Sequence, residues 1–295
     1  MGSTCGEEGV RMNYDHKVTE LIRMRSSWRT YDELPLETGV MSELRMACAE
    51  LDRGLFGEKL SMRIVDLTET APVGAKLGDY GTLRKVRYFL GGVIEEGPLA
   101  YASYGYRMEQ LVLRATDLGL GTCWLGYFDR ALFPDLKPGA GELFPAVSAV
   151  GYVASRRRLA ERLIRTAIAA KKRKPWERMF FSGALDQPLS PTDAGPYEGP
   201  LIGVRAAPSS GHTQPWRVVK DPDAAVFHFF MVEVKESYQK QRLHDIDLGI
   251  GMSHFELVAR RYGLGGEWRV LGASPCPTPA KTTYLASWID DSVAD

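Results

Sequence analysis

The spacing of apolar and polar positions predicts alternating helices and strands in the first part of the chain. Residues 15–25 carry apolar side chains on one helical face, and Asp15 stands where an N-cap is expected. Residues 104–118 form the clearest helical pattern and are followed by Gly119, a typical residue just beyond a helix C-terminus. The pattern also predicts a helix over 42–51, strands over 60–67, 88–94 and 146–153, and a basic helix over 156–174.

The second part of the chain begins with residues 182–200, which contain four prolines and predict a connector. Beyond it, the pattern predicts a hairpin across the turn sequence Asp221-Pro222-Asp223, a long helix followed by Gly263, and a last strand. These elements cover residues 216–220, 225–232, 244–262 and 282–289.

The two long helices resemble each other when the chain is compared with itself at an offset of 144 positions. Gly105 then meets Gly249, and Trp124 meets Trp268. The same offset pairs Met108 with Met252, Leu113 with Leu257, and the G-L-G sequence at 119–121 with that at 263–265. Any two amphipathic helices that end in glycine would share part of this, but the common G-L-G and tryptophan favour an internal duplication.

Composition narrows the class of protein. Lys plus Arg and Asp plus Glu total 37 each in 295 residues, so the basic excess typical of nucleic-acid-binding proteins is missing. The apolar runs are too short to span a bilayer, and the four cysteines lack the CxxC spacing of zinc sites. We expect a cytoplasmic protein with reduced thiols, no metal, no membrane or nucleic-acid partner, and a disordered leader over residues 1–13.

Arg25, Ser27 and Arg29 alternate at the end of the first predicted helix. In an extended segment these side chains point the same way, and two guanidinium groups with a hydroxyl suit a phosphate, because arginine offers planar, bidentate donors. From the spacing alone, a solvated basic helix end is the better-supported interpretation, since the helix macrodipole favours cations there.

Residues 207–216, with the sequence APSSGHTQPW, predict a loop rich in hydrogen-bonding side chains; we call them the serine loop. Ser209, Ser210, His212 and Gln214 lie close together in sequence, which suits the polar edge of a heterocycle, although an ordinary surface loop would have the same composition.

Residues 119–128 contain glycines but do not form a dinucleotide-binding fingerprint. The spacing is not GxGxxG, and the segment follows a helix instead of a strand. Its apolar character predicts a short strand, in which Gly126 would let a flat ligand approach the backbone. His244 and His254 show no metal-ligand spacing and are expected to be exposed or structural.

Several of these segments resemble the nitroreductase family. ELIRMRSSWRTYDELPL is similar to its opening helix, APSSGHTQPW to its APSSxNxQPW segment, and ATDLGLGTCWLGYF to its A-x-x-LGLGTCW segment. VGY followed by KKRKPWERMFF is similar to its closing strand and basic extension. The resemblance extends over about residues 14–290 and is strongest to a fused branch named "putative TM nitroreductase" after a source organism.

The resemblance implies an FMN site. Arg25, Ser27 and Arg29 would hold the phosphate and part of the ring edge, and Lys171 and Arg173 would match a basic pair that closes on the phosphate. Leu125 and Gly126 would supply backbone groups near flavin N5 and O4. Ser209, Ser210 and His212 would come from what is normally the other subunit, with His212 standing where the family usually has Asn. The loop at 79–82 lies near where the family contacts the ring.

The resemblance also implies the fold. It is an α+β, three-layer sandwich with a central, mostly antiparallel sheet, duplicated as a single-chain pseudo-dimer. Residues 14–165 would form the first nitroreductase-like half and residues 166–295 the second, degenerate half, intertwined around one FMN site. Only one composite site keeps its motifs, because residues 52–57 lack the serines and Val270 stands where the first half has Gly126. Such a chain is expected to be competent as a monomer.

The function implied is hydride transfer from NADH or NADPH, through flavin N5, to an unknown small-molecule acceptor such as a nitro compound or quinone, in a ping-pong sequence. No protein acid or nucleophile is assigned, because the flavin carries the chemistry. The alternatives are a flavin-binding sensor or carrier without turnover, and a flavin-modifying or dehalogenating enzyme of the same superfamily.

Overall fold

The computed structural model describes residues 12–32, 34–68, 83–153 and 173–291. Within them the strands form two five-stranded sheets. We call the part up to residue 153 the first half and the part from residue 173 the second half. The predicted boundary at 165/166, the basic helix over 156–174 apart from its last two residues, Lys171 and the loop at 79–82 all lie outside the described residues.

The first sheet has the order β1-β2-β5-β3, with β4 paired to β2, and all its pairs are antiparallel. In the second sheet, of order β6-β7-β8-β10-β9, only the β6–β7 pair is parallel. The strands are β1 (Leu60–Asp66), β2 (Tyr88–Glu95), β3 (Gly121–Leu125), β4 (Glu142–Leu143), β5 (Val147–Gly151), β6 (Phe180–Ser182), β7 (Trp216–Lys220), β8 (Val226–Val232), β9 (Glu267–Arg269) and β10 (Thr282–Ile289).

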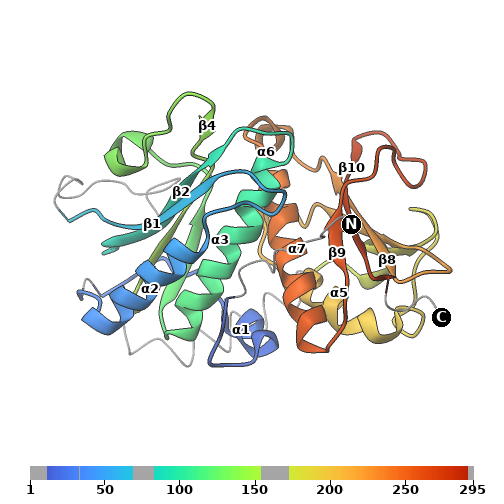
Figure 1. Ribbon diagram of the computed structural model, residues 1–295, viewed down its shortest axis with the longest axis horizontal. Helices are drawn as coiled ribbons and strands as arrows, with labels where there is room; N and C mark the ends of the chain where they lie inside the picture. The colour runs from blue at the N-terminus through green and yellow to red at the C-terminus, as the bar shows by residue number, and fades with distance from the viewer. Residues whose placement is uncertain (1–11, 33, 69–82, 154–172, 292–295) are drawn as a thin grey trace, which may run out of the picture.

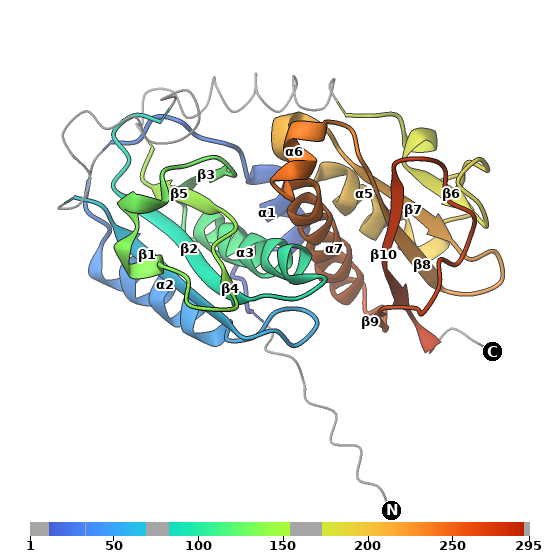
Figure 2. The ribbon, with the colours of Figure 1, turned by 90° about the horizontal axis from the view of Figure 1, so that it is seen from above.

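The two longest helices of the described residues, α3 and α7, lie side by side in the middle of the molecule, and the sheets lie on the two outer sides (Figures 1 and 2). α1 packs against α3, α5 and α7, so the first helix of the chain contacts both halves. The helices are α1 (Val18–Met24), α2 (Thr38–Glu50), α3 (Ala100–Asp117), α5 (Glu198–Ala206), α6 (Glu236–Lys240) and α7 (Leu243–Arg261).

α3 and α7 cross at two glycines, which allow their backbones to touch. A Cβ atom on Gly105 would lie 2.3 Å from the carbonyl oxygen of Ile246, and one on Gly249 would lie 1.9 Å from that of Ala102. The glycines are 144 positions apart, and so are Ala102 and Ile246. Each helix therefore meets the other through equivalent residues, which is the reciprocal pattern of a two-fold axis.

The largest core cluster is shared by the two halves. It joins Leu90 and Met108 of the first half to Phe229 and Phe255 of the second. Alternation along the strands sends neighbouring side chains to opposite faces, so Phe89 joins a separate cluster with Phe133 and Phe144 on the outer face of the first sheet. The pairing of the halves is thus stabilised by burial of apolar side chains in one common core.

The structure confirms the α+β class with mostly antiparallel sheets and the predicted long helices, within a few residues at their ends. Asp15 as N-cap was wrong, because α1 begins after Lys17 and the Asp15 amide donates to the Asp117 carboxylate instead, at 2.7 Å. The connector prediction over 182–200 missed the start of α5 at Glu198. Gly199 and Pro200 hide this helix from propensity arguments, although proline is tolerated in a first turn. The duplication remains a prediction.

We predict that Gly249→Ala lowers the free energy of unfolding by about 2 kcal/mol or more, because the new methyl group forces the crossing helices apart. Gly39→Ala in α2 is the matched control, since a Cβ there meets nothing within 4 Å. That variant should lose no stability and should gain up to about 1 kcal/mol. Urea denaturation followed by circular dichroism measures both, and equal effects of the two substitutions would contradict the contact described here.

Candidate functional site

The segment after α1 runs beside β3 at the edge of the first sheet. Ser27 forms a parallel bridge with Thr122, and the Trp28 amide donates to the Thr122 carbonyl oxygen over 2.9 Å. Because α1 packs between the central helices, Arg25 at its C-terminus reaches the seam between the two halves.

Arg25 is buried with unused hydrogen-bond donors. Its side chain is 9% exposed, and its Nε lies 4.0 Å from Oε1 of the buried Glu109, a distance too long for a hydrogen bond. Within the described part of the chain, Nε and Nη1 of Arg25 have no acceptor. Leaving a buried donor unpaired costs about 1–3 kcal/mol, so this place suits an anion that would accept from the guanidinium.

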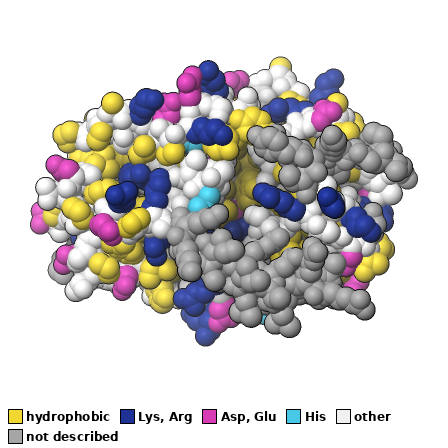
Figure 3. Space-filling model, turned by 180° about the vertical axis from the view of Figure 1, so that it is seen from behind, with side chains coloured by type: hydrophobic (Ala, Val, Ile, Leu, Met, Phe, Trp, Pro, Cys, Tyr) yellow, Lys and Arg dark blue, Asp and Glu magenta, His cyan; other side chains and the backbone are white. Residues whose placement is uncertain are grey.

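Arg25 and Arg205 both lie near the guanidinium of Arg173, and we call these three residues the arginine cluster. Arg173 donates to the carbonyl oxygens of Ala206, over 2.7 Å, and of Ala207. Burial, followed by the charges of Arg25 and Arg205, lowers the pKa of Arg173 to about 10. On the rear face of the molecule, Lys and Arg side chains lie on both sides of the seam (Figure 3). A phosphate would relieve the repulsion between these cations.

The serine loop is fastened to the segment that carries Arg173. Lys174 donates its backbone N–H to Oε1 of Gln214 over 2.8 Å and its Nζ to the Thr213 carbonyl oxygen over 2.7 Å. Arg205 in turn donates from Nε to the Lys174 carbonyl oxygen over 3.1 Å. The loop and the basic segment therefore form one connected unit.

Asp247 on α7 holds the serine loop from the helix side. Its Oδ1 accepts from the Ser210 backbone N–H at 2.9 Å and from the Ser210 hydroxyl at 3.2 Å. The Ser209 hydroxyl accepts from the Gln214 backbone N–H at 2.9 Å. Both serines thus have partners inside the protein and stabilise the conformation of the loop.

Burial raises the pKa of the Asp247 carboxyl to about 8, the nearby charge of Asp245 adds to the effect, and the two hydrogen bonds from Ser210 oppose it. Oδ2 of Asp247 has no partner among the described residues. A carboxyl in this position keeps its proton near neutral pH, because desolvation penalises the charged form.

The end of β3 meets the second half directly. A Cβ on Gly126 would lie 2.6 Å from a methyl carbon of Leu243 at the start of α7. Glycine is therefore needed at position 126 because the Leu243 side chain packs against the backbone there. The next residue, Tyr127, donates its hydroxyl to the Ser237 carbonyl oxygen over 3.0 Å. Leu125 is buried in β3 and pairs with Val147.

The structure brings together Arg25, Arg173 and the serine loop, which come from distant parts of the sequence. Ser27 and Arg29 are exposed, unlike the buried Arg25 side chain, so only Arg25 of that alternating set belongs to the arginine cluster. His212 lies within the serine loop with a backbone φ of 62°, in the left-handed region. His244 and His254 are fully buried, as structural histidines would be.

Sequence reasoning missed Asp247, Glu109 and Arg205 as members of this region. The offset of 144 carried a usable signal, because it pairs Asp247 with Ser103 and Glu109 with Ser253. Buried acidic residues are rare, so an acidic residue at a buried position where the similar helix has serine indicates a position at which the two halves differ in role.

The equivalent loop of the first half is arranged differently. There Ser103 of α3 donates its hydroxyl to Oε1 of Glu58 over 2.9 Å, and Oε2 of Glu58 accepts from the Phe56 amide over 3.2 Å. A Cβ on Gly54 would lie 2.3 Å from this carboxylate. The carboxyl group that meets the serine thus comes from the loop in the first half and from the central helix in the second.

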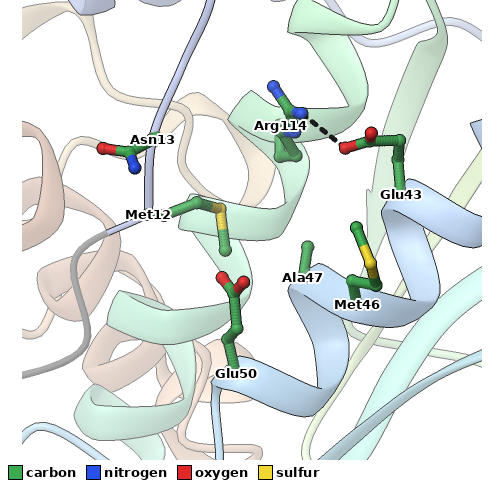
Figure 4. A pocket seen from close by; sticks show the side chains of 7 residues that line it. All are labelled: Met12, Asn13, Glu43, Met46, Ala47, Glu50 and Arg114. Atoms are coloured by element: carbon green, nitrogen blue, oxygen red, sulfur yellow. Dashed lines mark hydrogen bonds and ion pairs between the residues drawn. The ribbon is translucent and has the colours of Figure 1, made fainter.

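A separate surface pocket lies against α2 and α3, lined by Met12, Asn13, Glu43, Met46, Ala47, Glu50 and Arg114 (Figure 4). An ion pair of 2.7 Å joins Arg114 to Glu43 across it. None of the residues expected to bind the cofactor lines it.

In the described ranges, no group of three or more His, Cys, Asp or Glu side chains could hold a metal ion. The same ranges contain no helix of the length and apolar character that a membrane span requires.

Comparison with known families identifies the chain. The family model described as "Putative TM nitroreductase" matches residues 17–259. The chain belongs to this nitroreductase family. No curated protein matches it.

One solved nitroreductase has the same overall fold. It is a putative nitroreductase from Thermotoga maritima, 19% identical, with a TM-score of 0.60 over 98% of this chain and 99% of that chain. A putative nitroreductase in complex with FMN from Desulfovibrio desulfuricans is 23% identical, with a TM-score of 0.38 over 50% of this chain and 95% of that chain. A nitroreductase with bound FMN from Bacteroides fragilis is 19% identical, with a TM-score of 0.36 over 47% and 89%.

We predict that Asp247→Asn changes how the stability of this nitroreductase depends on pH. The native carboxyl has a pKa of about 8 and the unfolded one about 3.8, so the native state holds an extra proton between these values. The free energy of unfolding therefore falls as pH rises through this window, by at most about 1.4 kcal/mol per pH unit.

The variant lacks this loss, and relative to wild type it should gain stability from about pH 5 to about pH 8. Urea denaturation at several pH values measures the difference. A difference that stays constant with pH would contradict the protonated carboxyl.

Proposed function

We propose that the chain binds FMN at the seam between its halves and acts as an FMN-dependent oxidoreductase. The observation that carries the proposal is the buried Arg25 guanidinium, whose Nε and Nη1 lack an acceptor within the described residues while Arg173 lies near it. A buried guanidinium group with open donors beside a second cation fits a phosphate monoester. Membership of the nitroreductase family makes FMN the phosphate-bearing molecule that best agrees with this arrangement.

Bound FMN would supply the redox chemistry, with N5 taking a hydride from NADH or NADPH and passing the electrons to a small acceptor such as a nitro compound or quinone. The protein would bind and orient it. Arg25 and Arg173 would contact the phosphate, and the serine loop would lie at the ring. The full set that we propose is Arg25, Ser27, Arg29, Leu125, Gly126, Lys171, Arg173, Ser209, Ser210 and His212.

We propose further that one chain completes the site without a partner. Arg25 belongs to the first half and the serine loop to the second. Arg173, which donates to the carbonyl oxygens of Ala206 and Ala207 at the start of that loop, lies near Arg25. The counterpart loop holds Glu58 in place of a serine, and Val270, the counterpart of Gly126, is 53% exposed. These differences support one flavin site per chain.

We predict that the purified chain binds one FMN per polypeptide and runs as a monomer. Flavin titration against protein concentration, with light scattering for the mass, measures both quantities. Two flavins per chain would show that the Glu58 side is also a site, and a dimer that binds FMN only when associated would show that the halves do not complete the site alone.

We predict that Arg25→Ala weakens FMN binding at least about tenfold and leaves riboflavin nearly unchanged, because a charge-assisted hydrogen bond to the phosphate is worth about 1.5–3 kcal/mol. Arg45→Ala, an exposed arginine on α2, removes the same charge at a distance and should affect neither ligand. Fluorescence titration with the two flavins gives the four affinities. Equal losses for FMN and riboflavin would place Arg25 away from the phosphate.

Turnover is tested separately from binding. The FMN-loaded chain is mixed with NADH or NADPH without oxygen, and the visible flavin absorbance is followed before and after a quinone or nitro compound is added. Bleaching followed by recovery is the expected result. An FMN-loaded chain that neither nicotinamide reduces would instead be a flavin carrier or sensor.

A further inference from the structure

Two glutamates on the paired helices make comparable contacts: the buried Glu109 on α3, and Glu256 on α7, whose side chain is 19% exposed. Each accepts a hydrogen bond from the tryptophan that follows the G-L-G sequence of its own half. Trp124 donates to Glu109 over 2.8 Å, and Trp268 donates to Glu256 over 2.8 Å.

Each glutamate also binds a side chain of the opposite helix. Oε1 of Glu109 lies 2.9 Å from Nε2 of His254, and Oε2 of Glu256 accepts from the Tyr106 hydroxyl at 2.7 Å. The two carboxylates therefore connect the halves in the same manner, and both are expected to contribute to the stability of the pairing.

The contact with His254 is well defined. Its Nδ1 lies 3.1 Å from the carbonyl oxygen of Gly203, which can only accept, so this nitrogen carries a proton. Nε2 faces the Glu109 carboxylate, and a second proton must lie in that hydrogen bond. Glu109 is thus fixed through Trp124 on β3 and through His254 on α7.

The two glutamates differ in the arginine that each one faces. Glu256 lies 3.5 Å from Arg260, one turn along the same helix, whose side chain is 37% exposed. Glu109 is fully buried and lies 4.0 Å from Arg25, whose side chain is 9% exposed. Glu109 is therefore the carboxylate that faces the arginine cluster.

At 4.0 Å, Oε1 of Glu109 attracts the Arg25 guanidinium but accepts no hydrogen bond from its Nε. Opposite charges at this separation attract strongly in a buried place, yet no hydrogen bond forms, and Nε and Nη1 of Arg25 stay open within the described chain. Arg173 repels Arg25 from another side. Glu109, held in place by Trp124 and His254, is the carboxyl group that lies beside Arg25 on the side of α3.

We propose that Glu109 is a positioning residue, which holds the Arg25 guanidinium beside Arg173 with its donors free for the phosphate of FMN. This inference rests on the proposed FMN site. Because His254 of the second half also holds Glu109, the phosphate site depends on the pairing of the two halves.

The test compares Glu109→Gln with Glu256→Gln in the full chain, by titration with FMN and with riboflavin. Glu109→Gln should lose FMN affinity about tenfold, comparable to losses seen when partners that orient a ligating side chain are removed, and riboflavin affinity should change less than about twofold. Glu256→Gln, which breaks matching contacts, should bind both flavins like wild type. In an Arg25→Ala background, Glu109→Gln should have no further effect on FMN.

Parallel losses of FMN and riboflavin in Glu109→Gln, or a loss of FMN that persists without Arg25, would overturn the inference and leave the FMN site standing. A wild-type chain that binds neither flavin would overturn the proposed function itself. If Glu109→Gln does not fold, Glu109→Asp keeps the charge and withdraws the carboxylate by one methylene group. It should show the same selective loss of FMN in smaller measure, and an unchanged ratio of the two affinities would refute the positioning role.

Discussion

The backbone contact between α3 and α7 at Gly105 and Gly249 is the constraint on which the rest of the molecule depends. With any larger residue at these positions, the helices would separate and the common core would lose its packing. Their close approach brings the end of β3 against Leu243 and allows His254 of one helix to meet Glu109 of the other. The seam between the halves is therefore both the centre of the hydrophobic core and the place where charged groups are brought together.

Burial gives the charges at this seam their properties. In water, Arg25, Arg173 and Asp247 would each be solvated and independent. Between packed halves, Arg173 has a lowered pKa, Asp247 has a raised one, and Nε and Nη1 of Arg25 have no acceptor in the described part of the chain. Burying charged groups and unpaired donors costs folding free energy, which the extensive apolar contacts around them offset. Such regions are common where proteins bind charged ligands. The hydrogen bond from the Lys174 amide to Gln214 gives the serine loop a structural role as well, because it holds the basic segment in place.

Much of the architecture could be predicted from sequence, and the reasons are local. Long amphipathic patterns predict α3 and α7, alternation of apolar and polar residues predicts β1, an apolar run predicts β2, and the turn sequence at 221–223 predicts the hairpin that contains β8. All of these signals lie in consecutive residues. α5 was missed, since Gly203 has low helix propensity and is there because His254 and Val258 pack against it. The grouping of Arg25 with Arg173 followed from family resemblance alone. The offset of 144 singles out Glu109 and Asp247, but their roles could not be assigned, because they arise from contacts between segments more than thirty residues apart.

The unequal loops on the two sides of the seam have a consequence for how such a protein can change. When two identical subunits pair, every substitution is made twice, and an improvement on one side is imposed on the other. In this chain Ser210 faces Asp247 while Ser103 faces Glu58, and each of these four positions is encoded separately. One side can lose its ligand-binding groups and be optimised for rigidity, while the other keeps its buried charges. The cost in stability of a charged site is then carried once per pair of halves instead of twice.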